Sequence, residues 1–212
     1  MKKILFSCLF IALGSFVMAQ TPLGRAQCDE LIKSLTERAA LIQTMQCSFV
    51  QYKTMTMLSE PIVSEGTLCY SASDKMRWEY THPYQFALIV NGTQTIRVKE
   101  GKAEILDANQ GKMYKGLADL IMGSASGKNM FDTSLFDVVF YDDDAFWRAE
   151  MTPKRHSIKR MFSQLVFRFN KQTLIIDQVD FVEPKGDLTT IHFDNILLNE
   201  TVDETIFSIF VR

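Results

Sequence analysis

The chain has 212 residues, a formal net charge of −2 and 47% hydrophobic residues. This length suits one β-rich domain, and the mildly acidic balance argues against nucleic acid or an anionic membrane surface as the partner. Sixteen phenylalanines and eleven methionines suit either a packed core or a cavity for flexible apolar ligands, and composition alone does not choose between them.

Residues 1–19 have the pattern of a secretory signal peptide. Two lysines precede an apolar run over residues 4–17, and Ala19 offers a small residue at the expected cleavage site. The run is short for a membrane span and no basic stop follows it. We therefore expect a soluble, exported protein with one domain over residues 20–212.

Three cysteines follow this segment: Cys28, Cys47 and Cys69. Their odd number leaves at least one unpaired unless a bridge joins two chains. A Cys28–Cys47 disulfide would suit an oxidising compartment, and burial of the thiols as small hydrophobes is the alternative. Their spacing fits no zinc motif.

The mature chain opens with a helix, expected over residues 24–45, because apolar residues recur there at three- and four-residue spacing. The first strand is expected over residues 48–52 and continues over 54–58. A meander of antiparallel strands then begins at residues 66–70.

Within this meander, residues 76–80 alternate between apolar and polar, so Met76, Trp78 and Tyr80 share one face of a strand. Proline at position 83 ends that strand, because proline cannot donate to a central ladder.

The next strand is expected over residues 86–90. Asn91-Gly92 then predicts a two-residue hairpin with positive φ angles, and the chain returns as residues 93–98.

Beyond the meander, a helix is expected over residues 114–122, followed by a polar loop over 124–128. This helix would lie across the sheet as a fixed cover or a moving lid. Residues 153–162 predict irregular structure or one helical turn. Three aspartates at 142–144 indicate a hairpin turn, since they lack the ligand spacing of a calcium loop. Further strands are expected over residues 103–106, 135–141, 145–151, 164–169, 174–182, 188–198 and 205–210.

The sequence contains no common catalytic or phosphate-binding motif, and its three histidines are far apart. We expect neither catalysis nor a cofactor or metal. Two alternatives stay open at this point. One is a secreted hydrolase that depends on a histidine, and the other is a structural β domain in which the aromatic residues form solid core.

An ordered set of short motifs spans nearly all of the mature chain. The motifs are Ser48-Phe49-x-Gln51, Gly66-x-Leu68, Met76-Arg77-Trp78-Glu79-Tyr80-x-x-Pro83, Asn91-Gly92, and the set Leu165, Phe167, Phe169, Gly186, Asp187, Thr189, Ile191 and Phe193. In this ordered set the sequence resembles the periplasmic outer-membrane lipoprotein carrier (LolA-like) family.

The resemblance implies a mainly β (α+β) fold: a single curved antiparallel sheet forms an incomplete β-barrel, and helices cover its concave face. It also implies a monomeric periplasmic chaperone that carries lipoprotein acyl chains from an inner-membrane ABC transporter to an outer-membrane acceptor lipoprotein. The side chains expected to line its hydrophobic cavity are Phe49, Leu68, Met76, Trp78, Tyr80, Phe86, Leu88, Leu117, Leu120, Ile121 and Phe167.

One departure from the family pattern bears on function. Many members have an Arg-Pro pair just before the Arg-Trp strand, where the arginine is tied to holding the helical lid, whereas this chain has Ser71-Ala72-Ser73-Asp74. The alternative is therefore a module of the same fold that senses lipoproteins or binds a different lipid.

Overall fold

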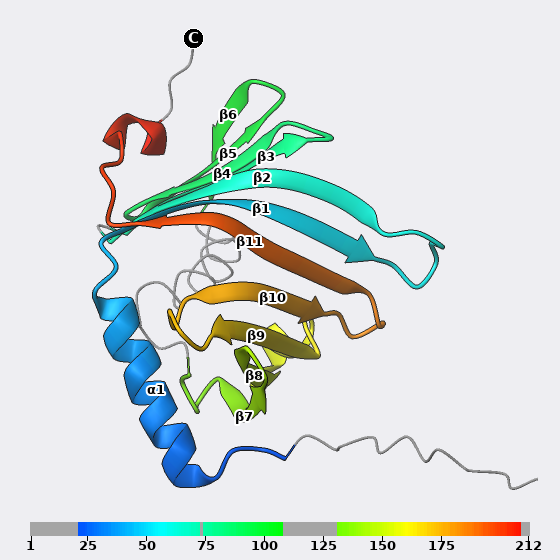
Figure 1. Ribbon diagram of the computed structural model, residues 1–212. Coiled ribbons are helices and arrows are strands. Elements are labelled where there is room, and N and C mark those ends of the chain that lie inside the picture. The colour runs from blue at the N-terminus through cyan, green and yellow to red at the C-terminus, as the bar shows by residue number, and fades with distance from the viewer. Residues whose placement is uncertain (1–20, 73, 108–130, 209–212) are drawn as a thin grey trace, which may run out of the picture.

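The computed structural model describes residues 21–72, 74–107 and 131–208 (Figure 1). These residues form one 11-stranded antiparallel sheet in the order β6-β5-β4-β3-β2-β1-β11-β10-β9-β8-β7. The strands are β1 Thr44–Thr54, β2 Ile62–Ser71, β3 Lys75–His82, β4 Phe86–Asn91, β5 Gln94–Lys99, β6 Lys102–Ile105, β7 Phe136–Asp143, β8 Phe146–Pro153, β9 Gln164–Asn170, β10 Ile176–Val182 and β11 Leu188–Leu198.

The sheet is open rather than closed. Among the strands that the structure describes, neighbours in the sheet are consecutive in sequence except β1 and β11, which pair across most of the chain. Strands β6 and β7 form the two edges, and the sheet curls strongly between them (Figure 1). The expected incomplete barrel built from one curved antiparallel sheet is confirmed.

Alternate residues of the strands turn toward the concave side and form the main core. On β1, for example, Met45, Cys47 and Phe49 are buried while the residues between them are only half-buried. Helix α1 (Arg25–Ala40) adds Leu31 and Leu35 to the same cluster. Each fully buried side chain of this size stabilises the fold by about 1.5–3 kcal/mol.

A smaller apolar cluster lies on the convex side. It contains Cys69, Ile89 and Ile96 from three strands, together with Phe207 from the 3₁₀-helix η1 (Glu204–Phe207). Because Cys69 follows Leu68 on β2, the two residues point to opposite faces and belong to different clusters. The C-terminal segment therefore covers part of the outer face.

Two elements are shorter than their sequence patterns predict. Helix α1 ends at Ala40 rather than residue 45, because residues from Thr44 onward pair with both β2 and β11. Strand β10 begins at Ile176 rather than 174, since Leu174 has a φ of +57°, outside the range of a strand.

The predicted continuation of the first strand over residues 54–58 is wrong. Strand β1 ends at Thr54, and the chain turns instead. The Thr56 N–H and hydroxyl both donate to Asp187 Oδ1, at 2.9 and 3.1 Å, and the Leu58 N–H donates to the Met55 carbonyl. This turn ties the β1–β2 hairpin to the β10–β11 hairpin.

The final predicted strand, residues 205–210, is also wrong over its described part. Asp203 caps η1 by accepting from the Thr205 N–H at 2.9 Å. The Arg77 guanidinium and the Asn91 amide then donate to the carbonyls of Ile206 and Phe207. These local bonds satisfy backbone groups that a strand would have paired with a neighbour.

Two hairpin turns are shifted from their predicted positions. The β7–β8 turn is formed by Asp144, which has a φ of +31°, and Ala145, because Asp142 and Asp143 still pair with Trp147 and Phe146 at the end of β7. One helical turn, α3 (His156–Lys159), occupies the segment expected to be irregular or a single turn. The β4–β5 turn is shifted by one residue, because Asn91 pairs with Gln94 and only Gly92 has a positive φ, at +58°. The helix expected over residues 114–122 and its loop lie outside the described residues.

Candidate functional site

The concave face of β1 and β3 holds a group of aromatic rings around Trp78. The centroids of the Phe49 and Trp78 rings lie 4.3 Å apart, and the Phe193 ring of β11 meets Trp78 edge-on with 6.2 Å between centroids. Phe49 also meets Tyr80 edge-on at 5.2 Å. Tilted and edge-on pairs of this kind each add about 0.5–1.5 kcal/mol beyond their buried area.

Gly66 makes this ring group possible. On β2 it lies directly between Phe49 of β1 and Tyr80 of β3. A Cβ at this position would lie 2.5 Å from the Phe49 ring and 2.1 Å from the carbonyl oxygen of Glu79. The missing side chain therefore lets Phe49 reach across β2 to the aromatic residues of β3.

The aromatic row continues outward along β3 and β4. Tyr80 lies 5.3 Å from Tyr84 and 6.1 Å from Phe86, measured between ring centroids. Trp78 is 6% exposed, whereas Tyr84 is 48% exposed. The row thus runs from the buried floor of the concave face to solvent.

Tyr80 places a hydroxyl in the partly buried section of this row. Its hydroxyl donates to Gln51 Oε1 at 2.8 Å. Burial, followed by the neighbouring Tyr84, raises the pKa of Tyr80 to about 12. The hydroxyl therefore stays protonated, and available as a donor, over the physiological pH range.

The other half of the concave face is rich in phenylalanine. Phe167 and Phe169 of β9 stack at 6.4 Å, and Phe131 meets Phe140 of β7 edge-on at 5.2 Å. Ala149 and Met151 of β8 are fully buried between these strands. The apolar lining therefore continues from β4, through β1, to β7 as one cluster.

The structure brings together the described residues that the sequence predicts for the cavity. Six are buried in the concave cluster: Phe49, Leu68, Met76, Trp78, Leu88 and Phe167. Tyr80 and Phe86 are partly buried and pack against it. Leu117, Leu120 and Ile121 lie outside the described residues. Contact of these side chains with a ligand stays a prediction.

Other members of the face were not identified from the sequence. They include Met45, Gln51, Tyr70, Phe136, Phe140, Met151 and Phe193. Two-residue alternation on β1 and β11 would have found Met45 and Phe193. No local pattern pairs Gln51 with Tyr80, because the two residues lie on strands separated by β2.

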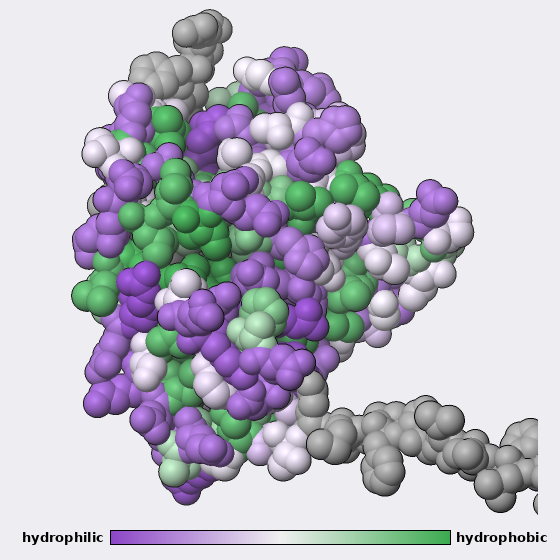
Figure 2. All heavy atoms as spheres, viewed as in Figure 1, coloured by the Kyte–Doolittle hydropathy of each residue, from purple (hydrophilic) through white to green (hydrophobic). Residues whose placement is uncertain are grey.

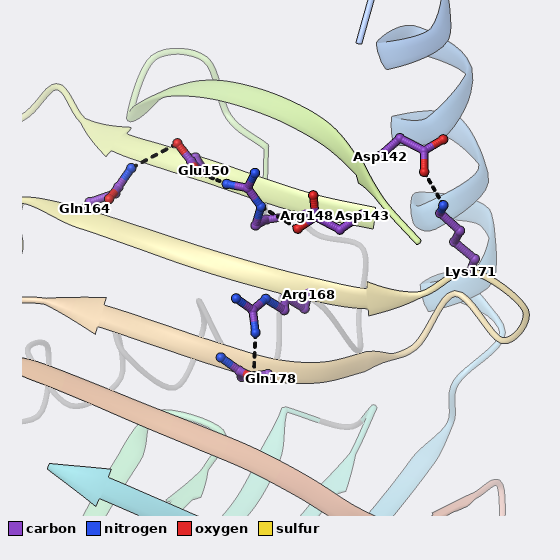
Figure 3. A network of polar contacts seen from close by, with 8 residues as sticks. All are labelled: Asp142, Asp143, Arg148, Glu150, Gln164, Arg168, Lys171 and Gln178. Atoms are coloured by element: carbon purple, nitrogen blue, oxygen red, sulfur yellow. Dashed lines mark hydrogen bonds and ion pairs between the residues drawn. The ribbon is translucent and has the colours of Figure 1, made fainter. Parts of the chain in front are cut away.

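Polar groups gather on the opposite, convex face of β7–β10 (Figure 3). The Arg148 guanidinium bonds to Asp143 Oδ2 at 2.6 Å, contacts Glu150, and lies 4.2 Å over the Tyr141 ring. Arg168 donates to Gln178 at 3.0 Å. No group of three or more His, Cys, Asp or Glu side chains suited to a metal ion occurs among the described residues.

Some apolar side chains also reach the outer surface. Figure 2 shows them beside the junction of α1 and β11, and toward the projecting β1–β2 hairpin. Exposed large apolar residues in these segments include Leu41, Leu197, Ile62 and Val63. They are interspersed with polar residues, so the continuous apolar lining belongs to the concave side.

The three histidines lie on separate elements. His82 ends β3, His156 begins α3, and the His192 ring on β11 meets Tyr52 at 5.9 Å. The three cysteines among the described residues are free thiols, so the possible Cys28–Cys47 disulfide is not formed. Cys47 and Cys69 are buried, as the alternative expects. None of the helices described in the structure has the length and apolar character needed to cross a bilayer.

The chain is similar to several solved structures at low sequence identity. An uncharacterized conserved protein from Thermus thermophilus is 8% identical with a TM-score of 0.56, and the match covers 87% of this chain and 94% of that one. MucB, in its complex with MucA from Pseudomonas aeruginosa, is 11% identical with a TM-score of 0.51, over 87% of this chain and 61% of that one. A LolA superfamily protein from Nitrosomonas europaea is 11% identical with a TM-score of 0.44, and the match covers 84% of this chain and 97% of that one.

The sequence itself assigns the family. No curated protein matches this chain significantly. The family model described as "Outer membrane lipoprotein carrier protein LolA" matches residues 40–210, which include every strand of the sheet and η1. The chain therefore belongs to the LolA family of outer membrane lipoprotein carrier proteins.

Proposed function

We propose that this protein is a periplasmic carrier that binds the acyl chains of lipoproteins on its concave face. It would accept them from an inner-membrane lipoprotein-releasing ABC transporter and pass them to an outer-membrane acceptor lipoprotein. The observation that carries this proposal is the aromatic row from Phe49 to Tyr84, which connects a buried apolar floor with solvent. Membership of the carrier family supports the same function.

The energetics suit a carrier. Each buried methylene contributes about 0.8 kcal/mol, so one long acyl chain gains on the order of 10 kcal/mol on leaving water. A ligand would have to separate side chains that now contact one another, such as Phe49 and Trp78. That cost lowers the net affinity and favours release to the next partner.

The proposed transport is binding without catalysis. It requires neither a nucleophile nor a metal in this chain, and energy for release from the inner membrane would come from the transporter. We propose that residues 1–19 are removed on export and that the mature protein acts as a monomer.

Two measurements test this function. Native mass spectrometry of the protein isolated from the exported fraction should show a bound acylated species. The protein should also release a lipoprotein from inner membranes that contain the transporter. Failure in both assays, despite a folded protein, would contradict the carrier role.

A second candidate is a binding module of the same fold with another ligand. It is favoured by the Ser71–Asp74 segment, which stands where many family members have Arg-Pro. MucB has a related fold and is bound to the protein MucA. A native mass spectrum with a lipid unrelated to lipoproteins, together with no lipoprotein release, would favour this candidate.

A further inference from the structure

Gln51 introduces an amide into the aromatic part of the concave face. It lies two residues after Phe49 on β1, and therefore on the same face. Its strand partners are Ser64 on β2 and Ile191 on β11. The side chain is half-buried, so it is close to the apolar lining yet open to an incoming group.

Tyr80 fixes how this amide can bind. The Tyr80 hydroxyl donates to Gln51 Oε1, which leaves the NH₂ group as the free end of the amide. Among the described residues, Gln51 Nε2 has no hydrogen-bond acceptor. This end of the side chain is a donor, and it can bind an acceptor such as a carbonyl oxygen.

The polarity of the face changes stepwise along β1. Phe49 is fully buried and aromatic, Gln51 is an amide, and Lys53 forms an ion pair with Glu183 at 3.1 Å. These three positions alternate onto one face of the strand. The order from hydrocarbon to amide to charge matches the order of groups along an acylated amphiphile: chain, carbonyl and polar head.

We propose that Gln51, oriented by Tyr80, is a subsite for the carbonyl oxygen that joins an acyl chain to its head group. The ligand class is an amide- or ester-linked long acyl chain. The chain would lie toward Phe49 and Trp78, and the head group would lie toward Lys53. This inference rests on the proposed acyl-chain binding and adds a residue that selects for the linkage.

A pair of ligands that differ only at the linkage tests it. N-methylpalmitamide offers a carbonyl oxygen, whereas hexadecyl methyl sulfide has the same chain length and only a weak sulfur acceptor. Each of the two ligands would be measured by its competition with a fluorescent fatty acid for binding to the protein. The protein would be produced with its signal sequence. The amide preference is the ratio of amide to sulfide affinity, and a net hydrogen bond of about 0.5–1.5 kcal/mol predicts that it is about two- to tenfold higher in the unaltered protein than in a protein whose residue 51 cannot donate.

Three variants distinguish this hydrogen bond from nonspecific hydrophobic binding. Gln51→Met should lower the amide preference by this factor, because its thioether keeps the length but cannot donate. Tyr80→Phe should reduce the preference by freeing the amide to rotate. Gln46→Met makes the same change on the opposite face of β1 and should keep the full preference.

The outcomes distinguish the two proposals. An amide preference that is the same in the unaltered protein and in Gln51→Met would overturn the subsite alone. Failure of the unaltered protein to bind the fatty acid or either competitor would overturn acyl-chain binding itself.

Discussion

Gly66 shows how a single residue shapes the candidate site. Its motif with Leu68 is visible in the sequence, but the reason for the glycine is not. Only the pairing of β2 with β1 and β3 shows that the Phe49 ring and the Glu79 carbonyl occupy the space of a side chain.

Replacing Gly66 with alanine should therefore destabilise the fold strongly. The added Cβ would displace both the Phe49 ring and the backbone of β3, and overpacking of this kind costs about 1–3 kcal/mol or more. Urea unfolding of Gly66→Ala should show this loss. Gly24→Ala is the control, since its Cβ would meet only an ordinary 3.5 Å contact and should change stability by less than about 1 kcal/mol. Equal effects of the two changes would contradict the packing described for Gly66.

The Cys47 thiol should make stability depend on alkaline pH. Burial raises its pKa from 9.0 to about 12. Above pH 9 the unfolded thiol loses its proton while the folded one keeps it, so the free energy of unfolding falls as pH rises from about 9 to 12. Below pH 9 this thiol has no effect on the slope.

Unfolding at pH 8 and pH 10 measures this contribution. The loss in the unaltered protein should exceed that in Cys47→Ala by about 1.4 kcal/mol, the equivalent of one pKa unit. Cys69 also has a raised pKa but is present in both proteins, so the difference isolates Cys47. Identical losses would show that Cys47 is not held protonated by the fold.

At the scale of elements, sequence patterns locate the strands better than their ends. The alternation over residues 76–80 predicts both β3 and the face carried by Trp78. Helix α1 ends early because β1 has partners on both sides, and no window of sequence contains those partners. Local periodicity cannot weigh such long-range pairing against helix propensity.

The 3₁₀-helix η1 shows a second limit of local patterns. Three of its four residues, Thr205, Ile206 and Phe207, are β-branched or aromatic, which favours a strand. The Asp203 cap and the donors from Arg77 and Asn91 nevertheless select a turn that places Phe207 in the convex cluster. The capping residue is close in sequence, but the apolar surface against which Phe207 packs is formed by residues of β2, β4 and β5.

Phe207→Ala should therefore be costly even though the residue is close to the C-terminus. Phe207 is fully buried, and Phe-to-Ala changes in cores cost about 3–5 kcal/mol. Leu197→Ala, at a position that is 54% exposed, should cost less than about 1 kcal/mol. Thermal or urea unfolding checks both. A small effect of Phe207→Ala would mean that η1 does not anchor the outer face.

At the scale of the whole molecule, the family motifs predict the open, curved sheet, and eight of the proposed cavity residues do share its concave cluster. What the sequence could not supply is the continuity of that cluster. Phe136, Phe140 and Met151 join it through the order of β7, β8 and β9. The Gln51–Tyr80 pair likewise depends on two strands that flank a third.

The proposed carrier function requires that hydrocarbon chains bind against the aromatic row of the concave face. The chain has two tryptophans, so Trp147→Phe leaves Trp78 as the sole tryptophan, and Trp78→Phe leaves Trp147 as a comparison. The most direct measurement is quenching of Trp78 fluorescence by a fatty acid brominated along its chain, with the unbrominated acid as control. Binding of the acyl chain beside Trp78 predicts saturable quenching in Trp147→Phe by the brominated acid alone. Binding of the acid without quenching of Trp78, or no binding at all, would contradict it.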